Sequence, residues 1–271
     1  MSLILLSLTL FIGLESRGAT RWIPLFGLRL QFSEILKPFL IASVAAYLQI
    51  KKNYLRAFVL GLIPTILIFK QPDLGSALVY LSGLGSLIFL SGINLIYVVG
   101  GTIAAVVALP IFWHFLADYQ KTRFLSFLNP GSDPLGASYN AIQATIAVGS
   151  GMFFFCVLGR GPQSQLLFLP EHHTDFIFAT LAEELGFIGA GALLLVYFVL
   201  IWRIFKTKNV LAICLGVMIL TQVFINVGMN LGVLPVTGIT LPLVSYGGAS
   251  VLATMISLGM IENIASSELS L

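Results

Sequence analysis

The chain of 271 residues is 58% hydrophobic and only 9% charged, which excludes a soluble globular domain, since such domains carry roughly 25% charged residues. The basic residues behind the net charge of +3 form no long run, which excludes nucleic acid as a partner. Apolar segments that cross lipid must be helical, because hydrocarbon cannot satisfy open backbone groups. The composition therefore predicts an all-α, polytopic transmembrane helix bundle.

The chain begins with a short apolar run. Residues 3–14 are apolar but cover only about 12 positions, fewer than the roughly 20 that cross a membrane. No basic residue precedes this run, which disfavours a secretory signal. Residues 15–31 are polar and interrupted by Pro24, and we expect a loop that holds Arg21 and Trp22 at the membrane interface.

Further apolar runs bring the predicted number of membrane spans to about eight. Glu34 and Lys37 stand in the first turns of the second run, and their spacing of three residues lets them pair on a helix. Pro72 forbids one continuous helix through the third and fourth runs, so the chain is expected to turn there. The runs after the first lie at 33–50, 57–69, 74–90, 95–116, 176–205, 210–233 and 241–264.

One long polar segment, residues 117–174, separates the first five runs from the last three. It is rich in turn residues, and its helix-like stretch at 141–148 is too short to span a membrane. Loops of this length in compact proteins are usually functional. We therefore predict one large extracytoplasmic loop with one or two interfacial or re-entrant pieces.

Lysine and arginine in the short loops predict the orientation. One such loop carries Lys51 and Lys52, and another carries Arg203 and Lys206. Cytoplasmic loops are enriched in these residues. Both loops are therefore predicted inside, which places both termini in the cytoplasm and the long loop outside.

Ionisable residues gather where the long loop meets the next span: Glu171, His172, His173, Asp175, Glu183 and Glu184. Thr174 is predicted to cap a helix that begins at Asp175. On that helix Asp175 shares a face with small residues, namely Ala179, Ala182, Gly186 and Gly189. An acid in a first turn also complements the helix dipole, so this role for Asp175 stays open beside a catalytic one.

Five motifs resemble, in the same order, those of the SEDS family (shape, elongation, division and sporulation): QPDLGSALVY, DYQKTR, NPGSDPLGASYNAIQATIAVGSG, QSQLLFLPEHHTDFIFATLAEELGFIG and LPVTGITLPLVSYGGAS. The resemblance runs from about residue 18 to residue 264, and it is strongest to the rod-shape branch of the family rather than the division branch. It implies a single SEDS-type membrane domain over residues 1–271, with the external loop at about 117–174.

The resemblance also implies an activity. SEDS proteins are peptidoglycan glycosyltransferases that polymerise lipid II, a lipid-linked disaccharide pentapeptide, during cell elongation and cell-shape maintenance. The implied location is the bacterial cytoplasmic (inner) membrane, and the implied partners are a class B penicillin-binding protein (a transpeptidase) and other cell-elongation machinery. The alternatives are a flippase of lipid-linked precursors and a non-catalytic scaffold for the penicillin-binding protein.

The family motifs assign candidate residues. The acid of the family's HTDF motif, its proposed catalytic residue, corresponds to Asp175. The QPSE…K pattern corresponds to Gln31, Ser33, Glu34 and Lys37, with Phe32 in place of proline. Substrate-binding roles are expected for Arg21, Trp22, Glu34, Lys37, Gln71, Asp73, Arg123, Gln163, Glu171, His173 and Thr174. Structural or intramembrane roles are expected for Glu183, Glu184, Ser245 and Tyr246.

These residues suit the chemistry of glycosyl transfer from a lipid-linked pyrophosphate. A base must accept the proton of the acceptor hydroxyl, and cations must stabilise the departing pyrophosphate. Asp175 suits the first role. The candidates for the second are Arg21, Lys37, Lys121, Arg123 and Arg160, and an anchor for phospholipid headgroups is the alternative role for each of them. His172 and His173 are adjacent on a turn and rarely converge, so no protein-held metal is predicted. The sequence leaves open whether the protein needs a divalent cation, and it predicts no other cofactor.

Two features depart from the family. SEDS proteins usually have ten spans, so this chain is expected to lack the first two and part of the third, either because the true start lies upstream or because the protein is shortened. The second is GSGMFFFCVLGRG, where the family carries a glycine-rich pattern. The apolar side chains at 152–155 are expected to change a flexible loop into one that prefers apolar contact.

Overall fold

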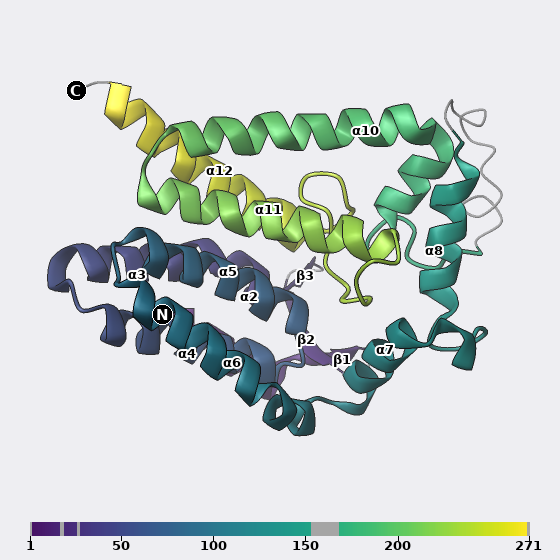
Figure 1. The fold of residues 1–271 in the computed structure, drawn as a ribbon, viewed down its shortest axis with the longest axis horizontal. Helices are drawn as coiled ribbons and strands as arrows, with labels where there is room; N and C mark the ends of the chain where they lie inside the picture. Colours follow the sequence, from purple (N-terminus) through teal and green to yellow (C-terminus); the bar gives the residue numbers. More distant parts are fainter. Residues whose placement is uncertain (1, 17–18, 26–27, 153–167, 270–271) are drawn as a thin grey trace. The chain divides into compact units, whose positions relative to one another are not determined.

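The computed structural model describes residues 2–16, 19–25, 28–152 and 168–269, and most of these are helical (Figure 1). The helices are α1 (Ser2–Ile12), α2 (Phe32–Ile35), α3 (Lys37–Lys51), α4 (Tyr54–Lys70), α5 (Leu74–Leu90), α6 (Leu95–Phe115), α7 (Asp118–Leu128), α8 (Tyr139–Ser150), α10 (Ile177–Lys206), α11 (Val210–Asn230) and α12 (Gly248–Leu269), with a 3-10 turn η1 (Pro130–Ser132). The strands are β1 (Leu14–Ser16), β2 (Ala19–Leu25) and β3 (Leu28–Leu30).

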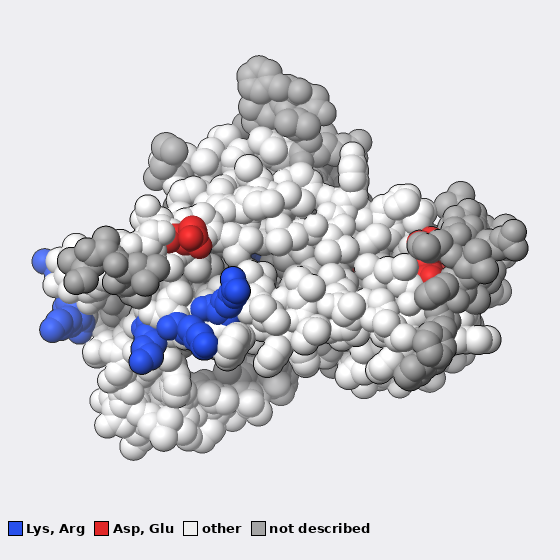
Figure 2. Space-filling model, turned by 90° about the horizontal axis from the view of Figure 1, so that it is seen from above, with Lys and Arg blue, Asp and Glu red and all other residues white. Residues whose placement is uncertain are grey.

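Within the described ranges, 5 helical segments are long and apolar enough to cross a membrane: 32–51, 95–115, 177–206, 210–230 and 248–267. Two shorter apolar helices lie at 2–11 and 74–90. On the face that Figure 2 shows, charged side chains are few and most of the surface is uncharged, as lipid contact requires. The predicted all-α, polytopic membrane fold is confirmed, and the count of about eight spans stays a prediction.

Polar side chains cap the helices around the first predicted breaks. The Asn53 side chain accepts the Arg56 N–H at the start of α4, and the Asp73 side chain accepts the Ser76 N–H at the start of α5. Each cap accepts from a backbone N–H group in the first helical turn that has no partner within the helix. The chain turns between α4 and α5, so the break predicted at Pro72 is confirmed.

The loop predicted at residues 15–31 is wrong, because most of this segment is a three-stranded antiparallel sheet in the order β1-β2-β3. Trp22 lies opposite Leu14, and Ile23 lies opposite Leu30. Ile23 is buried and α1 packs against β2. Antiparallel pairing satisfies backbone groups that a loop would have to expose at the membrane surface, which is the physical reason for the sheet.

The chain forms two compact units. Unit 1 comprises Met1–Ala117, Ile204–Ile219 and Gly248–Leu271, and unit 2 comprises Asp118–Arg203 and Leu220–Gly247. In unit 1, α4 packs against α3 and α5, and α12 packs against α2, α3 and β3. Its largest fully buried side chains include Tyr80 and Leu84 of α5.

The described part of unit 2 contains two apolar clusters. The first joins Phe178, Ala182 and Tyr197 of α10 to Val223 of α11 and to Leu241 in the segment between α11 and α12. The second joins α8 to the start of α10, through Ala144, Ala147, Leu169, Phe176 and Ala179. These clusters hold the beginning of α10 against α8 and against the segment that follows α11.

Three local predictions around the last spans are wrong. The helix predicted from Asp175 begins at Ile177, because the hydroxyl of Thr174 donates to Glu171 instead of capping. Gly186 interrupts α10 with φ 65° and ψ −169°, a conformation that essentially only glycine adopts, so the predicted single face of small residues is broken. The last span begins at Gly248 rather than at residue 241, because residues 241–245 close a separate turn.

Candidate active site

Asp175 lies in a turn at residues 171–176 that leads into α10. Glu171 has a left-handed φ of 59°, and its carbonyl accepts the backbone N–H groups of Thr174 at 3.1 Å and Phe176 at 3.3 Å. The Thr174 hydroxyl donates to the Glu171 carboxylate at 2.8 Å. Phe176 is 2% exposed and anchors the turn in the second apolar cluster of unit 2. The turn is therefore held on both sides of Asp175.

Two asparagines of α11 fix the backbone of Asp175. The side-chain amides of Asn226 and Asn230 donate to the Asp175 carbonyl at 3.0 and 3.1 Å. Asn226 also donates to the Ile239 carbonyl at 2.7 Å, and Asn230 accepts the Ala179 N–H at 3.1 Å. Both asparagines are fully buried. A buried amide without these partners would cost about 1–3 kcal/mol, so the network favours one position for Asp175.

The segment between α11 and α12 binds the same turn from another direction. The Ser245 hydroxyl donates to the Thr174 carbonyl at 2.6 Å and accepts the Leu241 N–H at 2.7 Å. The Tyr246 N–H donates to the His173 carbonyl at 2.9 Å, while the Tyr246 ring is 83% exposed. The carbonyls of residues 173, 174 and 175 therefore all accept hydrogen bonds from residues of α11 or of the segment that follows it.

The Asp175 carboxylate and the Arg123 guanidinium approach the same glycine. A Cβ atom on Gly238 would lie 3.5 Å from Asp175 Oδ2 and 3.7 Å from Arg123 Nη1. Gly238 has φ 75°, so a larger residue there would strain the backbone as well as crowd both groups. Arg123 Nη1 also donates to the Val236 carbonyl at 3.4 Å, and its guanidinium carbon lies 5.4 Å from the centre of the Tyr119 ring. A base and a cation thus share one small region of unit 2.

Further ionisable residues of unit 2 lie on α10 and in the turn that precedes it. Glu183 lies on α10 and is 1% exposed, whereas Glu184 is half-buried. The rings of His172 and His173 lie 3.8 Å apart and are tilted by 46°. Throughout the described ranges, no three His, Cys, Asp or Glu side chains are grouped so that they could hold a metal ion.

A second polar network occupies unit 1. Lys37 Nζ lies 2.7 Å from Glu34 Oε1, so the pairing predicted from their spacing is confirmed. The Ser76 hydroxyl donates to the same Glu34 oxygen at 2.6 Å, and its backbone N–H donates to Asp73 Oδ1 at 3.2 Å. Asp73 Oδ2 accepts from the side chains of Gln31 at 2.8 Å and Ser33 at 2.9 Å. Every member except Gln31 is less than 9% exposed, so these polar groups satisfy one another away from solvent.

The expected substrate-binding residues are thus distributed over both units. Unit 2 brings Arg123, Glu171, His173 and Thr174 together with Asp175, whereas Glu34, Lys37, Gln71 and Asp73 are buried in unit 1. Gln71 donates its amide to the Leu6 carbonyl at 2.9 Å. Trp22 lies half-buried on β2; for Arg21, also on β2, only the backbone is described, and Gln163 lies outside the described residues.

Sequence reasoning missed Asn226 and Asn230. They follow Gln222 at four-residue spacing on α11, and all three are buried. Four-residue spacing places side chains on one helix face, and buried polar groups within an apolar span are commonly functional. This polar stripe was visible in the sequence and would have identified α11 as the helix that supports the site.

Comparisons with known proteins agree with this architecture. The model of a family described as "Cell cycle protein", FTSW_RODA_SPOVE, matches residues 1–269. The chain is 44% identical over 268 residues to the peptidoglycan glycosyltransferase MrdB of Escherichia coli K12, which covers 93% of this chain and 72% of MrdB.

Solved structures are similar as well. One, described as "Structural coordination of polymerization and crosslinking by a peptidoglycan synthase complex", matches with a TM-score of 0.80 and 36% identity, and the match covers 98% of this chain and 78% of the solved chain. The rod shape determining protein RodA of Thermus thermophilus matches with a TM-score of 0.67 and 29% identity, over 98% of this chain and 75% of RodA.

Proposed function

The chain belongs to the cell cycle protein family of FtsW, RodA and SpoVE, and from this premise we propose that Asp175 is the base in its glycosyl transfer. The chain is a SEDS-family peptidoglycan glycosyltransferase and is similar to the rod-shape proteins, in line with the names of its relatives. The proposed substrate is lipid II, and the proposed product is a glycan strand.

The proposed reaction divides between two side chains. Asp175 accepts the proton of the acceptor sugar hydroxyl, whose oxygen then forms a bond to the anomeric carbon of the donor sugar. The bond between that carbon and the pyrophosphate oxygen breaks, and the pyrophosphate leaves with the electron pair. Arg123 stabilises the negative charge that develops on the pyrophosphate.

One observation carries this proposal, namely the way in which Asp175 is held. Its carbonyl accepts from Asn226 and Asn230, so these bonds use the backbone of Asp175 and none of its carboxylate oxygens. The carboxylate points to Gly238, which Arg123 also approaches. A base on a fixed backbone beside a cation is the preorganisation that proton abstraction and leaving-group stabilisation require.

Purified protein supplied with labelled lipid II in vesicles tests the function, with and without Mg²⁺. We expect glycan strands. Labelled lipid that moves between leaflets without polymerising would instead support a flippase, for which the buried Glu183 is the relevant intramembrane acid. Neither product, in the presence of a bound penicillin-binding protein, would support a scaffold.

We also propose that the protein lies in the bacterial cytoplasmic membrane with both termini inside. The supporting feature is the cationic character of the short segments at Lys51 and Lys206. After Cys156 and Cys214 are replaced, Ser132→Cys is expected to react with an impermeant thiol reagent in intact cells, whereas Ser267→Cys is expected to stay protected. Both positions are exposed, so burial does not limit the reaction. The reverse labelling pattern would contradict the orientation.

The transpeptidase partner is proposed to bind the membrane face of α10 and α11. Beyond the kink at Gly186, α10 exposes large apolar side chains, among them Leu195 at 61%, Val196 at 64% and Phe198 at 66%. Small residues next to such side chains let a second helix approach closely. A single membrane helix of a class B penicillin-binding protein would suit this surface.

Gly191→Leu is expected to reduce co-purification of this partner several-fold. Outside its chain neighbours and the adjacent backbone of α10, no atom among the described residues lies within 4 Å of a Cβ built on Gly191, so leucine fits the protein itself and blocks only what docks on it. Gly259→Leu on α12 is the control, because Gly259 is equally exposed and open. Equal recovery of the partner with both variants would place the interface elsewhere.

A further inference from the structure

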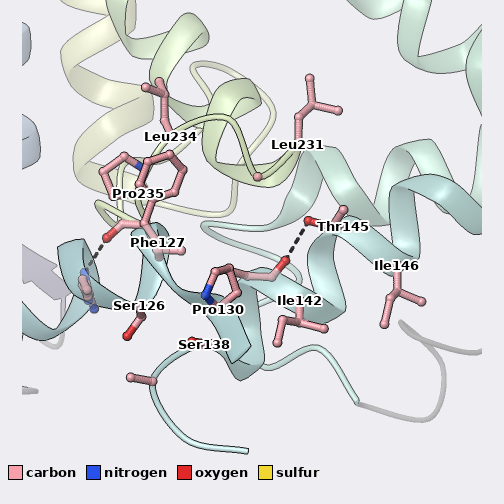
Figure 3. A pocket seen from close by; sticks show the side chains of 15 residues that line it. Ser126, Phe127, Pro130, Ser138, Ile142, Thr145, Ile146, Leu231, Leu234 and Pro235 are labelled. Atoms are coloured by element: carbon pink, nitrogen blue, oxygen red, sulfur yellow. Dashed lines mark hydrogen bonds between the residues drawn. The ribbon is translucent and has the colours of Figure 1, made fainter. Parts of the chain in front are cut away.

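Unit 2 contains a cavity of about 340 Å³ beside the candidate active site (Figure 3). Its walls come from α7, η1, the residues just before α8, α8 itself and the segment that follows α11. Most of the lining is apolar, and Phe127, Ile142, Leu234 and Pro235 are representative. The volume is at the small end of the range for ligand sites, which suits one extended apolar chain better than the two chains of a phospholipid.

The Ser138 hydroxyl is the first polar feature of this cavity. Ser138 lines the cavity and is 1% exposed, and its Oγ has no hydrogen-bond partner among the described residues. Its backbone is satisfied, because the N–H donates to the Asp133 carbonyl at 3.2 Å and the carbonyl accepts the Ile142 N–H at 3.0 Å. A buried hydroxyl is costly unless something bonds to it, which indicates a ligand with an oxygen acceptor.

Arg123 is the second polar feature. It lines the same cavity, and its Nη1 atom lies near the position where a Cβ of Gly238 would approach Asp175 Oδ2. A guanidinium has five N–H donors in a planar fork that suits phosphate oxygens. The cavity therefore combines an apolar interior with a cationic group next to the proposed base.

We propose that this cavity binds the first isoprene units of a polyisoprenyl pyrophosphate, with the apolar chain inside and the pyrophosphate at Arg123. The Ser138 hydroxyl donates to an oxygen of the same ligand. This inference rests on the proposed function, since lipid II carries such an anchor. Its consequence is that the enzyme recognises the lipid part of its substrate through unit 2 and places the pyrophosphate beside Asp175.

Equilibrium binding of farnesyl pyrophosphate and of inorganic pyrophosphate to the detergent-purified protein tests the cavity directly. The wild type is expected to bind farnesyl pyrophosphate at least about tenfold more tightly, because the chain buries apolar surface. Ser126→Trp, which places an indole at the cavity wall, is expected to abolish this difference while inorganic pyrophosphate still binds. Thr122→Trp is the matched control: it changes a hydroxyl residue one turn earlier on α7 that does not line the cavity.

Ser138→Ala separates a ligand role from a structural one. It is expected to weaken farnesyl pyrophosphate binding about two- to tenfold and to leave the melting temperature unchanged or higher, because the hydroxyl loses no partner within the described protein. Unchanged binding by Ser126→Trp, or equal competition by phosphatidylglycerol, would overturn the proposal. None of these measurements needs glycan synthesis, so a failed polymerase assay with intact chain-dependent binding would reject the proposed function and leave the cavity assignment standing.

Discussion

Asp175→Asn is expected to lower the rate of glycan synthesis by about 10²- to 10⁴-fold, the usual cost of losing a general base. Asparagine has nearly the size of aspartate, and the bonds from Asn226 and Asn230 go to the main-chain carbonyl, which the substitution keeps. The turn and the start of α10 should therefore stay as they are, while the group that accepts the proton is lost.

The measurement is polymerisation of labelled lipid II by the purified variant and the wild type, at matched melting temperature and matched partner binding. Asp118→Asn is the control, since Asp118 is an exposed carboxylate of α7 in the same unit. The control is expected to keep its activity. Synthesis by Asp175→Asn within about threefold of wild type would remove Asp175 from the mechanism, and the helix-dipole role would then explain this residue better.

Lys37→Met is expected to destabilise the protein by about 3–5 kcal/mol. The side chains of the Lys37–Glu34 pair are only 3% and 9% exposed, and the substitution removes the ammonium group while the Glu34 carboxylate stays buried. The Ser76 hydroxyl also donates to this carboxylate, but a neutral hydroxyl does not cancel its charge. Lys70→Met, which changes an exposed lysine at the end of α4, should have little effect.

The double variant Glu34→Gln with Lys37→Met is expected to recover most of this stability, because a neutral amide still accepts from Ser76 and residue 34 no longer carries a buried charge. Thermal unfolding in detergent measures both effects. A loss below about 1 kcal/mol in the single variant would mean that the pair behaves like a solvent-exposed one. Polymerisation by the double variant then tests substrate binding separately: lost activity in a restored fold would support the role expected for Glu34 and Lys37.

Much of the fold follows from patterns within short stretches of the sequence. The apolar runs predict the long helices, Pro72 predicts the turn between α4 and α5, and a spacing of three residues predicts the Glu34–Lys37 pair. These features depend on hydrophobic periodicity, on the missing N–H of proline and on helix geometry. None of them requires knowledge of which distant segments meet.

The environment of the candidate site was decided by the tertiary structure. Asn226 lies 51 residues from Asp175, and Arg123 lies 113 residues from the Val236 carbonyl that it binds. The sheet at residues 14–30 likewise depends on strand pairing and on packing against α1. The β-propensity of the local sequence does not predict it. The motifs of the sequence thus determined which residues could carry the chemistry. Only the folded chain decided that Arg123 joins Asp175 in unit 2, whereas in unit 1 Lys37 pairs with Glu34 and Ser33 donates to Asp73. The reason is that buried polar groups must find their partners wherever packing brings them together.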